Sequence, residues 1–395
     1  MTDTEKTGRI CVLFTADYEL YFGQNHVSER EVLIEPTEQI LCAFEEEGIP
    51  ITLFADVASV WRHRSFDVGQ DYVSLFEEQL QRAIRKGHDV QLHLHPHWLT
   101  SEFDGQRWQM DVSKFKLSDL GYGKRKDGSS VEELITRGKD YLEELLCPVD
   151  PFYRCVAFRA GGFGIQPEDK ALIRALLSVG FKIDSSIAPG MFFKSNVNEI
   201  DFRRIPMKLN YRMGTRYGIH EEEKTGIFEI PIAAYSESLY EALFHHLLLL
   251  KIFIADLKRK ILKAKNEFPP RGRVIQENSF LSQIIHQLLR PLFILELSGT
   301  HLNVNRMVKG TSKLIKRHLQ GPYDLYLSAL CHPKNVFPPT IRAILDFWRA
   351  MVRLYGKNIE AITFQEAAKR IECRPEGEAV EESLSSSKDE FIISR

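Results

Sequence analysis

Short apolar runs rich in β-branched residues recur along the chain, separated by longer segments whose apolar residues have helical spacing. Runs of this length predict buried strands. The eight predicted strands are RICVLFTAD (9–17), PITLFADV (50–57), DVQLHLH (89–95), CVAFRAG (155–161), KIDSS (182–186), IFEIPI (227–232), DLYLSALCH (324–332) and EAITF (360–364). Helices are predicted at 35–48, 74–87, 131–146 and 167–180. Alternating strands and helices are typical of parallel β/α units, and about eight such units favour an α/β barrel over an open sheet.

One segment interrupts this alternation. About ninety residues with helical patterns separate the strands at 227–232 and 324–332, too many for an ordinary connection. PPRG at 269–272 divides two apolar stripes, which predicts an inserted helical hairpin at about 236–320. The first stripe has a basic end, so two interpretations stay open: it packs on the barrel or its hairpin partner, or residues 238–265 make a peripheral membrane contact.

Composition narrows the class of protein. The 395 residues are 44% hydrophobic and 27% charged, which is typical of a soluble globular protein with a sizeable core. A net charge of -2 gives no reason to expect nucleic acid as the main partner. The N-terminus has no secretory signal and no run is long enough to span a membrane, so we expect a cytoplasmic protein with reduced cysteines. We expect the barrel within 1–372 and a disordered tail at 373–395.

Polar residues that carry chemistry gather where the predicted strands end. In β/α barrels reactive side chains lie at the C-terminal ends of the strands, so these residues are expected to converge on one rim. The strand-end candidates are Asp17 with Glu19 after it, His93, His95 and His97, Arg159, Asp184, and His332.

The stretch LHLHPHW (92–98) suggests a metal site, but its spacing leaves two alternatives. If Pro96 turns the chain, His93 and His97 can face the same ion; if strand alternation continues, His93 and His95 lie on one face. Two imidazoles and a carboxylate from the 17–19 stretch would leave an open position on zinc or a similar divalent ion. A bound water there would suit a hydrolase.

Five ordered motifs resemble the NodB-type polysaccharide deacetylase family. They are TADYE (15–19), GHDVQLHLHPH (87–97), FRAGGF (158–163), KIDSS (182–186) and LCH (330–332). The resemblance covers about residues 9 to 335, without the insertion and the tail, and it implies a distorted β/α barrel. The sequence departs from the family pattern in having Asp-Tyr-Glu in place of adjacent aspartates, Ala-Gly-Gly-Phe after Arg159, and the additional His95.

The resemblance also implies roles for individual residues. These are Asp17 as catalytic base, Arg159 as its partner, His332 as general acid, and Glu19, His93 and His97 as ligands of one divalent ion, most simply Zn²⁺. We further expect Asp184 and Trp98 to contact substrate. Because Asp-Tyr-Glu replaces the two adjacent aspartates of the family pattern, it stays open which of its carboxylates, Asp17 or Glu19, binds the metal.

The implied function is metal-dependent removal of N-acetyl groups from a sugar or polysaccharide precursor. Because we expect a cytoplasmic protein, or one peripheral to the inner face of the membrane, biosynthesis of a surface polysaccharide fits best. Two alternatives remain: a hydrolase of a small non-sugar C–N bond on the same fold, and a catalytically silent carbohydrate-binding relative.

Overall fold

A mixed α/β fold is built around one curled sheet in the computed structural model, which describes residues 8–123, 130–238, 240–241, 268–274, 292–299, 302–319 and 321–373. Eight strands follow the order β11-β12-β8-β7-β4-β3-β1-β16, and β17 pairs with β1. Their bounds are β1 (Ile10–Tyr18), β3 (Thr52–Asp56), β4 (Asp89–Leu94), β7 (Ala157–Ala160), β8 (Ile183–Asp184), β11 (Tyr211–Met213), β12 (Ile227–Glu229), β16 (Leu325–Cys331) and β17 (Ile359–Ala361). Only β11 runs antiparallel to its neighbour. All eight predicted strands are present.

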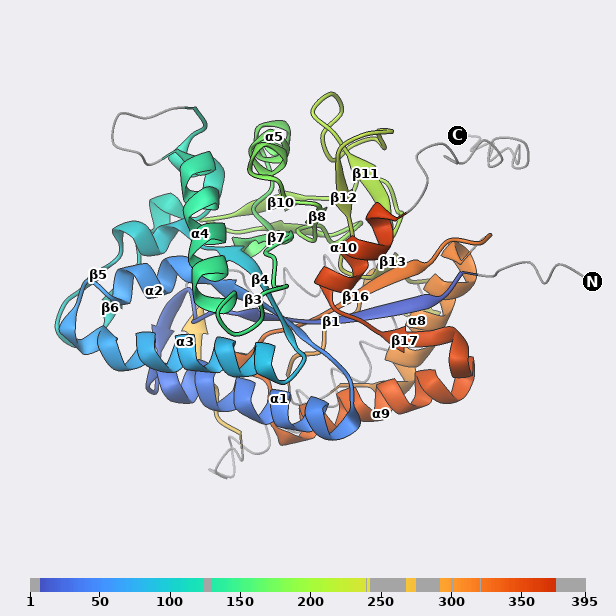
Figure 1. Cartoon of the computed structure of the whole chain (residues 1–395), viewed down its shortest axis with the longest axis horizontal. Coiled ribbons are helices and arrows are strands. Elements are labelled where there is room, and N and C mark those ends of the chain that lie inside the picture. The colour runs from blue at the N-terminus through green and yellow to red at the C-terminus, as the bar shows by residue number, and fades with distance from the viewer. Residues whose placement is uncertain are drawn as a thin grey trace, which may run out of the picture.

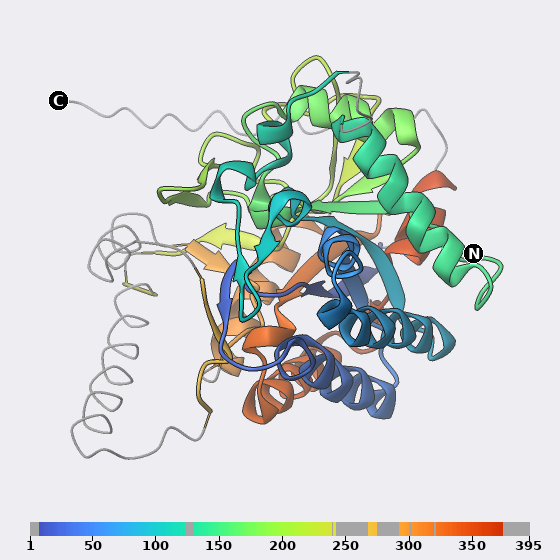
Figure 2. The ribbon, with the colours of Figure 1, turned by 90° about the vertical axis from the view of Figure 1, so that its left-hand side faces the viewer.

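Most of the helices pack on the outer side of this sheet (Figures 1 and 2). The helices of the described residues are α1 (Glu35–Glu47), α2 (Val57–His63), α3 (Gln70–Arg85), α4 (Val131–Leu146), α5 (Asp169–Val179), α8 (Val304–His318), α9 (Pro338–Tyr355) and α10 (Phe364–Glu372). The four predicted helices are confirmed as α1, α3, α4 and α5. Ser130 begins α4 with a capping box to Glu133, and α1 ends at Gly48, whose φ of 71° suits glycine.

The curl of the sheet brings its last strand toward β12. Beyond the end of β12, Ile232 forms a parallel bridge with Ser328 of β16, and the Ala233 N–H donates to the Ser328 carbonyl oxygen at 2.9 Å. The strands therefore surround an interior, as the end-on arrangement in Figure 2 shows. This is the barrel-like arrangement expected from the β/α pattern.

Four pairs of short strands form small two-stranded sheets apart from the main sheet. They are β2 (Gly23–Asn25) with β14 (Gly272–Val274), β5 (Glu102–Phe103) with β6 (Trp108–Gln109), β9 (Phe192–Lys194) with β10 (Glu199–Asp201), and β13 (Ala234–Ser236) with β15 (Leu292–Ile294). Since β14 and β15 lie inside the predicted insertion, the expectation that this whole segment is helical is wrong at these residues. Their extended backbones are stabilised by pairing with β2 and β13, which no local helical spacing reveals.

Three expectations fall on parts of the chain that lie outside the described residues. These are the two helices of the hairpin, the membrane contact through 238–265 apart from a few residues at its start, and the tail from 374 onward. Within the described part, no helix is both long enough and apolar enough to cross a membrane.

Alternation along the strands divides most of the core into two large clusters. Ile10, Val12 and Phe14 of β1 pack in the cluster shared with the outer helices, whereas Cys11 and Leu13 belong to a cluster inside the curl. Helix α10 contributes to this inner cluster, and its Phe364 ring lies 5.1 Å from that of Phe54. The interior is therefore apolar where the strands begin. The next inward positions, toward the strand ends, form the candidate site.

Candidate active site

The inner face of β1 changes from apolar to polar along the strand. Cys11 and Leu13 are followed at the same spacing by Thr15 and Asp17, and Glu19 comes just after the strand. Because successive strand residues face opposite sides, these polar side chains follow the apolar ones into the interior. The same alternation on β4 sends His93 inward, and both Asp17 and His93 are buried.

Arg159 on β7 lies buried beneath Asp17 and fixes its orientation. It is 1% exposed, and its Nη1 donates to Thr15 Oγ1 at 3.0 Å and to Asp17 Oδ1 at 2.6 Å. On its other side, Nε and Nη2 donate to the carbonyl and hydroxyl oxygens of Ser185, both at 2.9 Å, and Nη2 also reaches Ser328 Oγ at 3.3 Å. Each of the five N–H donors of the guanidinium thus has an acceptor, which fixes its orientation.

Asp17 is an ionised carboxylate in this setting. Burial by itself would raise its pKa, but the Arg159 guanidinium, assisted by His93 and His332, outweighs burial and holds the pKa of Asp17 below its usual range. The structure thus brings together the two residues expected to form the base and its partner. An ionised, oriented carboxylate can accept a proton.

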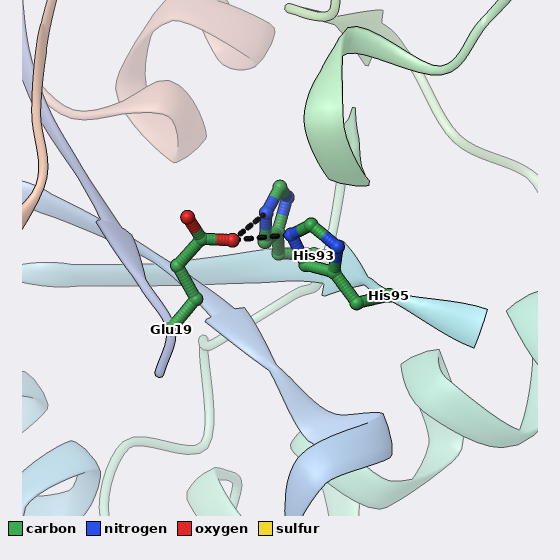
Figure 3. Close-up of side chains that lie close together, drawn as sticks. All are labelled: Glu19, His93 and His95. Atoms are coloured by element: carbon green, nitrogen blue, oxygen red, sulfur yellow. Dashed lines mark hydrogen bonds and ion pairs between the residues drawn. The ribbon is translucent and has the colours of Figure 1, made fainter. Parts of the chain in front are cut away.

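Glu19, His93 and His95 converge on one point (Figure 3). Glu19 Oε2 lies 3.1 Å from His93 Nε2 and also contacts His95 Nε2, and the three ligand atoms lie within 4.8 Å of one another. Burial opposes ionisation of Glu19, but Lys334 and His95 hold its pKa well below the usual range. This is the group of side chains among the described residues that could hold a metal ion.

The donor set fits a divalent ion. Imidazole nitrogens and a carboxylate oxygen are the ligand types that zinc takes in proteins, and here three of them lie within 4.8 Å of one another. His93 Nδ1 lies 2.8 Å from the Arg159 carbonyl oxygen, so the Nδ1 proton is donated there and the Nε2 lone pair faces Glu19. Two imidazoles and one carboxylate would leave a fourth position open.

Close packing holds His95 in place. A Cβ at Gly161 would come within 2.5 Å of the Leu94 carbonyl oxygen and 2.7 Å of His95 Nδ1, so only glycine allows this approach. The His95 N–H donates to Asp56 Oδ1 at 3.1 Å. Asp56 is fully buried, burial raises its pKa, and its Oδ2 has no hydrogen-bond partner among the described residues.

Lys334 neutralises the second oxygen of Glu19. Its Nζ lies 2.6 Å from Glu19 Oε1 and 3.0 Å from the Leu20 carbonyl oxygen, and it sits 5.2 Å from the centre of the Tyr21 ring. The two oxygens of Glu19 are therefore divided between a buried ammonium and the two histidines. This arrangement favours one-oxygen binding of an ion by Glu19.

His332 faces the same centre from the end of β16. Its Nε2 lies 3.7 Å from Asp17 Oδ2 and 3.8 Å from Glu19 Oε1, while its Nδ1 lies 3.5 Å from Glu296 Oε1. Burial would lower the pKa of His332, but Glu296, Asp17 and Glu19 together raise it. The charged imidazolium is stabilised, which suits a proton donor.

His97 lies beside this centre rather than in it. The backbone of His95 is still extended, and Pro96 begins the turn η3 (Pro96–Thr100), so alternation places His95 rather than His97 on the face of His93. The His97 ring packs 4.7 Å from that of Phe22, and neither ring nitrogen has a hydrogen-bond partner among the described residues. Burial, with the charge of His95, lowers the pKa of His97 well below its usual range. The histidines beside Glu19 are thus His93 and His95, whereas the family motif implies His93 and His97.

The two expected substrate residues lie in the core. Asp184 occupies the face of β8 opposite to its neighbours Ile183 and Ser185, which face the interior, because strand side chains alternate. Its carboxylate accepts from the N–H and the hydroxyl of Ser186 at 3.0 and 2.8 Å. Trp98 is 1% exposed and packs 5.5 Å from the Trp108 ring. Neither side chain reaches the centre formed by Glu19 and the histidines.

Three charged residues of the site were not predicted. Lys334 follows the Leu-Cys-His motif by two positions, Asp56 is the next-to-last residue of a predicted strand, and Glu296 lies in a segment expected to be helical. Asp56 could have been found by applying the strand-end rule to that strand. The sequence carries no local signal for Lys334 or Glu296, because their roles depend on contacts with residues far away along the chain.

Comparison with known proteins gives weak likenesses. No protein-family model and no curated protein sequence matches the chain. Among solved structures it is similar to a protein described as a polysaccharide deacetylase from Mycobacterium smegmatis, at 12% identity and a TM-score of 0.44 over 94% of this chain and 93% of that one. It is also similar to Puue allantoinase, at 12% identity and a TM-score of 0.42 over 92% and 90%, and to the α-amylase AmyC from Thermotoga maritima, at 8% and 0.38 over 91% and 74%. Likenesses with TM-scores below 0.5 do not identify the activity of this chain.

Proposed function

We propose that the chain is a metal-dependent hydrolase that removes N-acetyl groups from a sugar or polysaccharide precursor. The observation that carries this proposal is the arrangement at the strand ends. The carboxylate of Asp17 and the imidazole of His332 lie 3.7 Å apart, beside Glu19, His93 and His95, which could hold a metal ion. Amide hydrolysis requires a base, an acid and stabilisation of an oxyanion. The five motifs that resemble the deacetylase family support the choice of an N-acetyl sugar.

The side chains divide the reaction between them. A bound divalent ion, most simply Zn²⁺, supplies Lewis-acid polarisation of the amide carbonyl and of the attacking water. Asp17 accepts the proton of that water, and Arg159 keeps Asp17 ionised and aimed at it. His332 then donates a proton to the departing amine. Glu19, His93 and His95 hold the ion in place of the Glu19, His93 and His97 set implied by the resemblance.

Acetate release is the direct test of this function. The purified protein is loaded with Zn²⁺ and assayed against N-acetylated nucleotide-linked and lipid-linked sugars, with small non-sugar amides as a second substrate class. We expect acetate from at least one sugar. Asp17→Asn and His332→Ala should each lower kcat by about 10²–10⁴-fold while metal content stays at the wild-type level, because neither residue belongs to the ligand set.

The panel also separates the competing functions. Release from the non-sugar amides alone would replace the sugar substrate with another C–N bond on the same site. Stoichiometric metal without release from any substrate would contradict the proposal and favour a binding protein. Wild-type rates in either variant would overturn the role given to that residue.

A further inference from the structure

Residues 268–274 of the inserted segment connect the loop that follows β1 to the loop that follows β16. On one side, β14 pairs with β2, and the Arg271 carbonyl oxygen accepts from the His26 N–H at 2.8 Å. On the other side, the Phe268 ring lies 5.5 Å from that of Phe337, which ends the loop after β16. This part of the insertion therefore bridges the C-terminal ends of two neighbouring strands of the main sheet.

The Arg271 guanidinium holds the loop after β16 by its main chain. Its Nη1 donates to the Val336 carbonyl oxygen at 2.8 Å and to the Lys334 carbonyl oxygen at 3.1 Å, and the guanidinium carbon lies 4.4 Å from the centre of the Phe337 ring. Among the described residues Arg271 forms no ion pair with a carboxylate, so these carbonyl oxygens are its acceptors. Because both N–H groups of Nη1 are engaged, the turn η7 (Pro333–Asn335) is fixed against the insertion.

Gly272 allows the same segment to lie against Tyr21. A Cβ at Gly272 would come within 2.2 Å of Tyr21 Cδ2 and 2.8 Å of the Gln24 carbonyl oxygen, so a larger residue would displace the ring. The Tyr21 hydroxyl donates to Asn335 Oδ1 at 2.7 Å, and the centre of its ring lies 5.2 Å from Lys334 Nζ. Tyr21 thus joins the loop after β1 to η7.

Lys334 is the residue through which these contacts reach the metal cluster. Its buried Nζ donates to Glu19 Oε1 at 2.6 Å and to the Leu20 carbonyl oxygen at 3.0 Å. The other oxygen, Glu19 Oε2, is the one that faces His93 and His95 (Figure 3). While the ammonium stays on Oε1, Glu19 offers Oε2 alone to an ion. A carboxylate released from such a partner can bind an ion through both oxygens.

We propose that Arg271 and Gly272 are positioning residues for the metal carboxylate. They seat Lys334 on Glu19 Oε1, and Lys334 limits Glu19 to binding through one oxygen. The inserted segment is thereby part of the metal centre, although it supplies none of the three candidate ligands. The presence of an ion rests on the proposed function, whereas the contacts themselves belong to the chain and can be measured without one.

Cobalt(II) added to the purified, metal-free, full-length protein reports the coordination, because four-coordinate Co²⁺ absorbs visible light more strongly than five- or six-coordinate Co²⁺. We expect a strong band from the wild type and a weaker one from Lys334→Met, since Oε1 becomes free to bind. Arg271→Ala and Gly272→Ala should weaken the band in the same direction. Arg271→Lys, which keeps a donor for the carbonyl oxygens, should retain most of it. Arg273→Ala, at an exposed position on the same strand, is the matched control and should match the wild type.

Amide hydrogen exchange of the same proteins without metal tests the contacts separately. The Asn335 and Val336 N–H groups each donate to a carbonyl oxygen three positions earlier, at 2.8 and 2.9 Å. In Arg271→Ala these amides should exchange at least about ten-fold faster, because the loss of a hydrogen bond from a charged donor lowers local stability. In Arg273→Ala their exchange rates should equal those of the wild type.

The two measurements separate the possible failures. A wild-type Co²⁺ spectrum in Lys334→Met would overturn the control of Glu19 by Lys334. Equal exchange in Arg271→Ala and Arg273→Ala would overturn the role of the insertion. Should Lys334→Met fail to fold, the spectra of Arg271→Ala and Gly272→Ala, at half-buried positions, decide the same question.

The metal content of the wild type distinguishes this inference from the proposed function. Bound Co²⁺ with the expected variant spectra, but no acetate released from any substrate, would contradict the proposed function and leave the positioning role of Arg271 and Gly272 standing. A wild-type protein that binds neither Co²⁺ nor Zn²⁺ would contradict both.

Discussion

His95 and His97 are close in sequence but occupy different environments. His95 continues the extended backbone of β4 and shares its inward face with His93, whereas Pro96 turns the chain and places His97 between aromatic rings. A metal ligand needs a nitrogen lone pair directed at the other ligands, and the structure gives that geometry to His95. Which of the two histidines faces Glu19 therefore depends on where the extended backbone of β4 gives way to the turn.

Alanine substitutions at the two histidines should separate these environments. His95→Ala should weaken Zn²⁺ binding by more than about 100-fold, exceeding the loss typical of an outer-shell partner, because it removes a ligand. His97→Ala should keep stoichiometric metal and lose about 2–3 kcal/mol of stability through the cavity it leaves. Metal titration and thermal unfolding measure the two effects.

A third variant controls for packing at the same position. His97→Phe keeps a ring against Phe22 and Phe115 but has no nitrogen, so it should restore most of the stability and bind metal normally. Loss of metal in His97→Phe with retention in His95→Ala would return the site to the His93 and His97 pair of the family motif.

The sequence could predict those residues of the site that a local strand pattern reveals, and no others. Asp17, Glu19, His93 and Arg159 end recognisable strands, so alternation and the strand-end rule locate them. The choice between His95 and His97 required the backbone angles at one residue. Lys334 could not be predicted, because its pairing with Glu19 spans 315 positions and depends on how β16 sits beside β1.

At the scale of elements, β8 and β12 place two carboxyl groups side by side. Asp184 and Glu229 occupy paired positions on adjacent parallel strands, and both are fully buried. Burial and the neighbouring Asp184 raise the pKa of Glu229 well above its usual range, and burial also raises the pKa of Asp184. Burial and the adjacent carboxyl group therefore favour the protonated form of Glu229 in the folded protein.

This pair makes stability depend on pH. In the unfolded chain Glu229 loses its proton near its ordinary pKa of 4.5, whereas in the folded protein it retains it, so stability falls as pH rises from 4.5 toward the raised folded value. Glu229→Gln removes this titration while keeping the side-chain shape. The variant should gain Tm over wild type at pH 8 and lose that advantage near pH 4.

Thermal unfolding across this pH range provides the measurement, with Glu221→Gln at an exposed site as the control. A Tm difference between Glu229→Gln and wild type that stays constant with pH would show that Glu229 does not hold its proton in the fold.

The central strands could be predicted more completely than the paired strands at the periphery. Buried parallel strands such as β1 and β16 are seven to nine residues long and mostly apolar or β-branched, a pattern that has few other interpretations. The strands β14 and β15 have three residues each, and they are extended because β2 and β13 pair with them. Pairing between strands that are far apart in the sequence leaves no signal in the local pattern of apolar residues.

At the scale of the whole molecule, the site joins the two ends of the chain. β1 pairs with β16 over seven register positions, from Ile10 with Leu325 to Ala16 with Cys331. The apolar floor of the interior also needs the C-terminal region, since α10 contributes Phe364, Ala367 and Ile371 to it. The residues from the N-terminal half, including Arg159, form only part of the site, since His332 and Lys334 come from the C-terminal region.

A chain that ends at residue 323 should therefore fail to form the metal centre. It retains Glu19, His93 and His95, but β1 loses its partner strand and the interior loses α10. We expect no cooperative thermal transition and no stoichiometric Zn²⁺ in the shortened chain, and we expect both in the full chain. Cooperative unfolding with bound metal in the shortened chain would show that the ligand cluster forms without the C-terminal strands.

Because β1 pairs with β16, this strand pair cannot form until most of the chain has been synthesised. At about 5–20 residues per second, the 315 residues between Glu19 and Lys334 take roughly 15–60 s to be translated. Throughout this interval the edge of β1 that β16 will cover stays open, and the Glu19 carboxylate has no ammonium beside it. An exposed β-branched strand edge is a template for wrong pairing. The nascent chain should therefore depend on chaperones until β16 emerges from the ribosome.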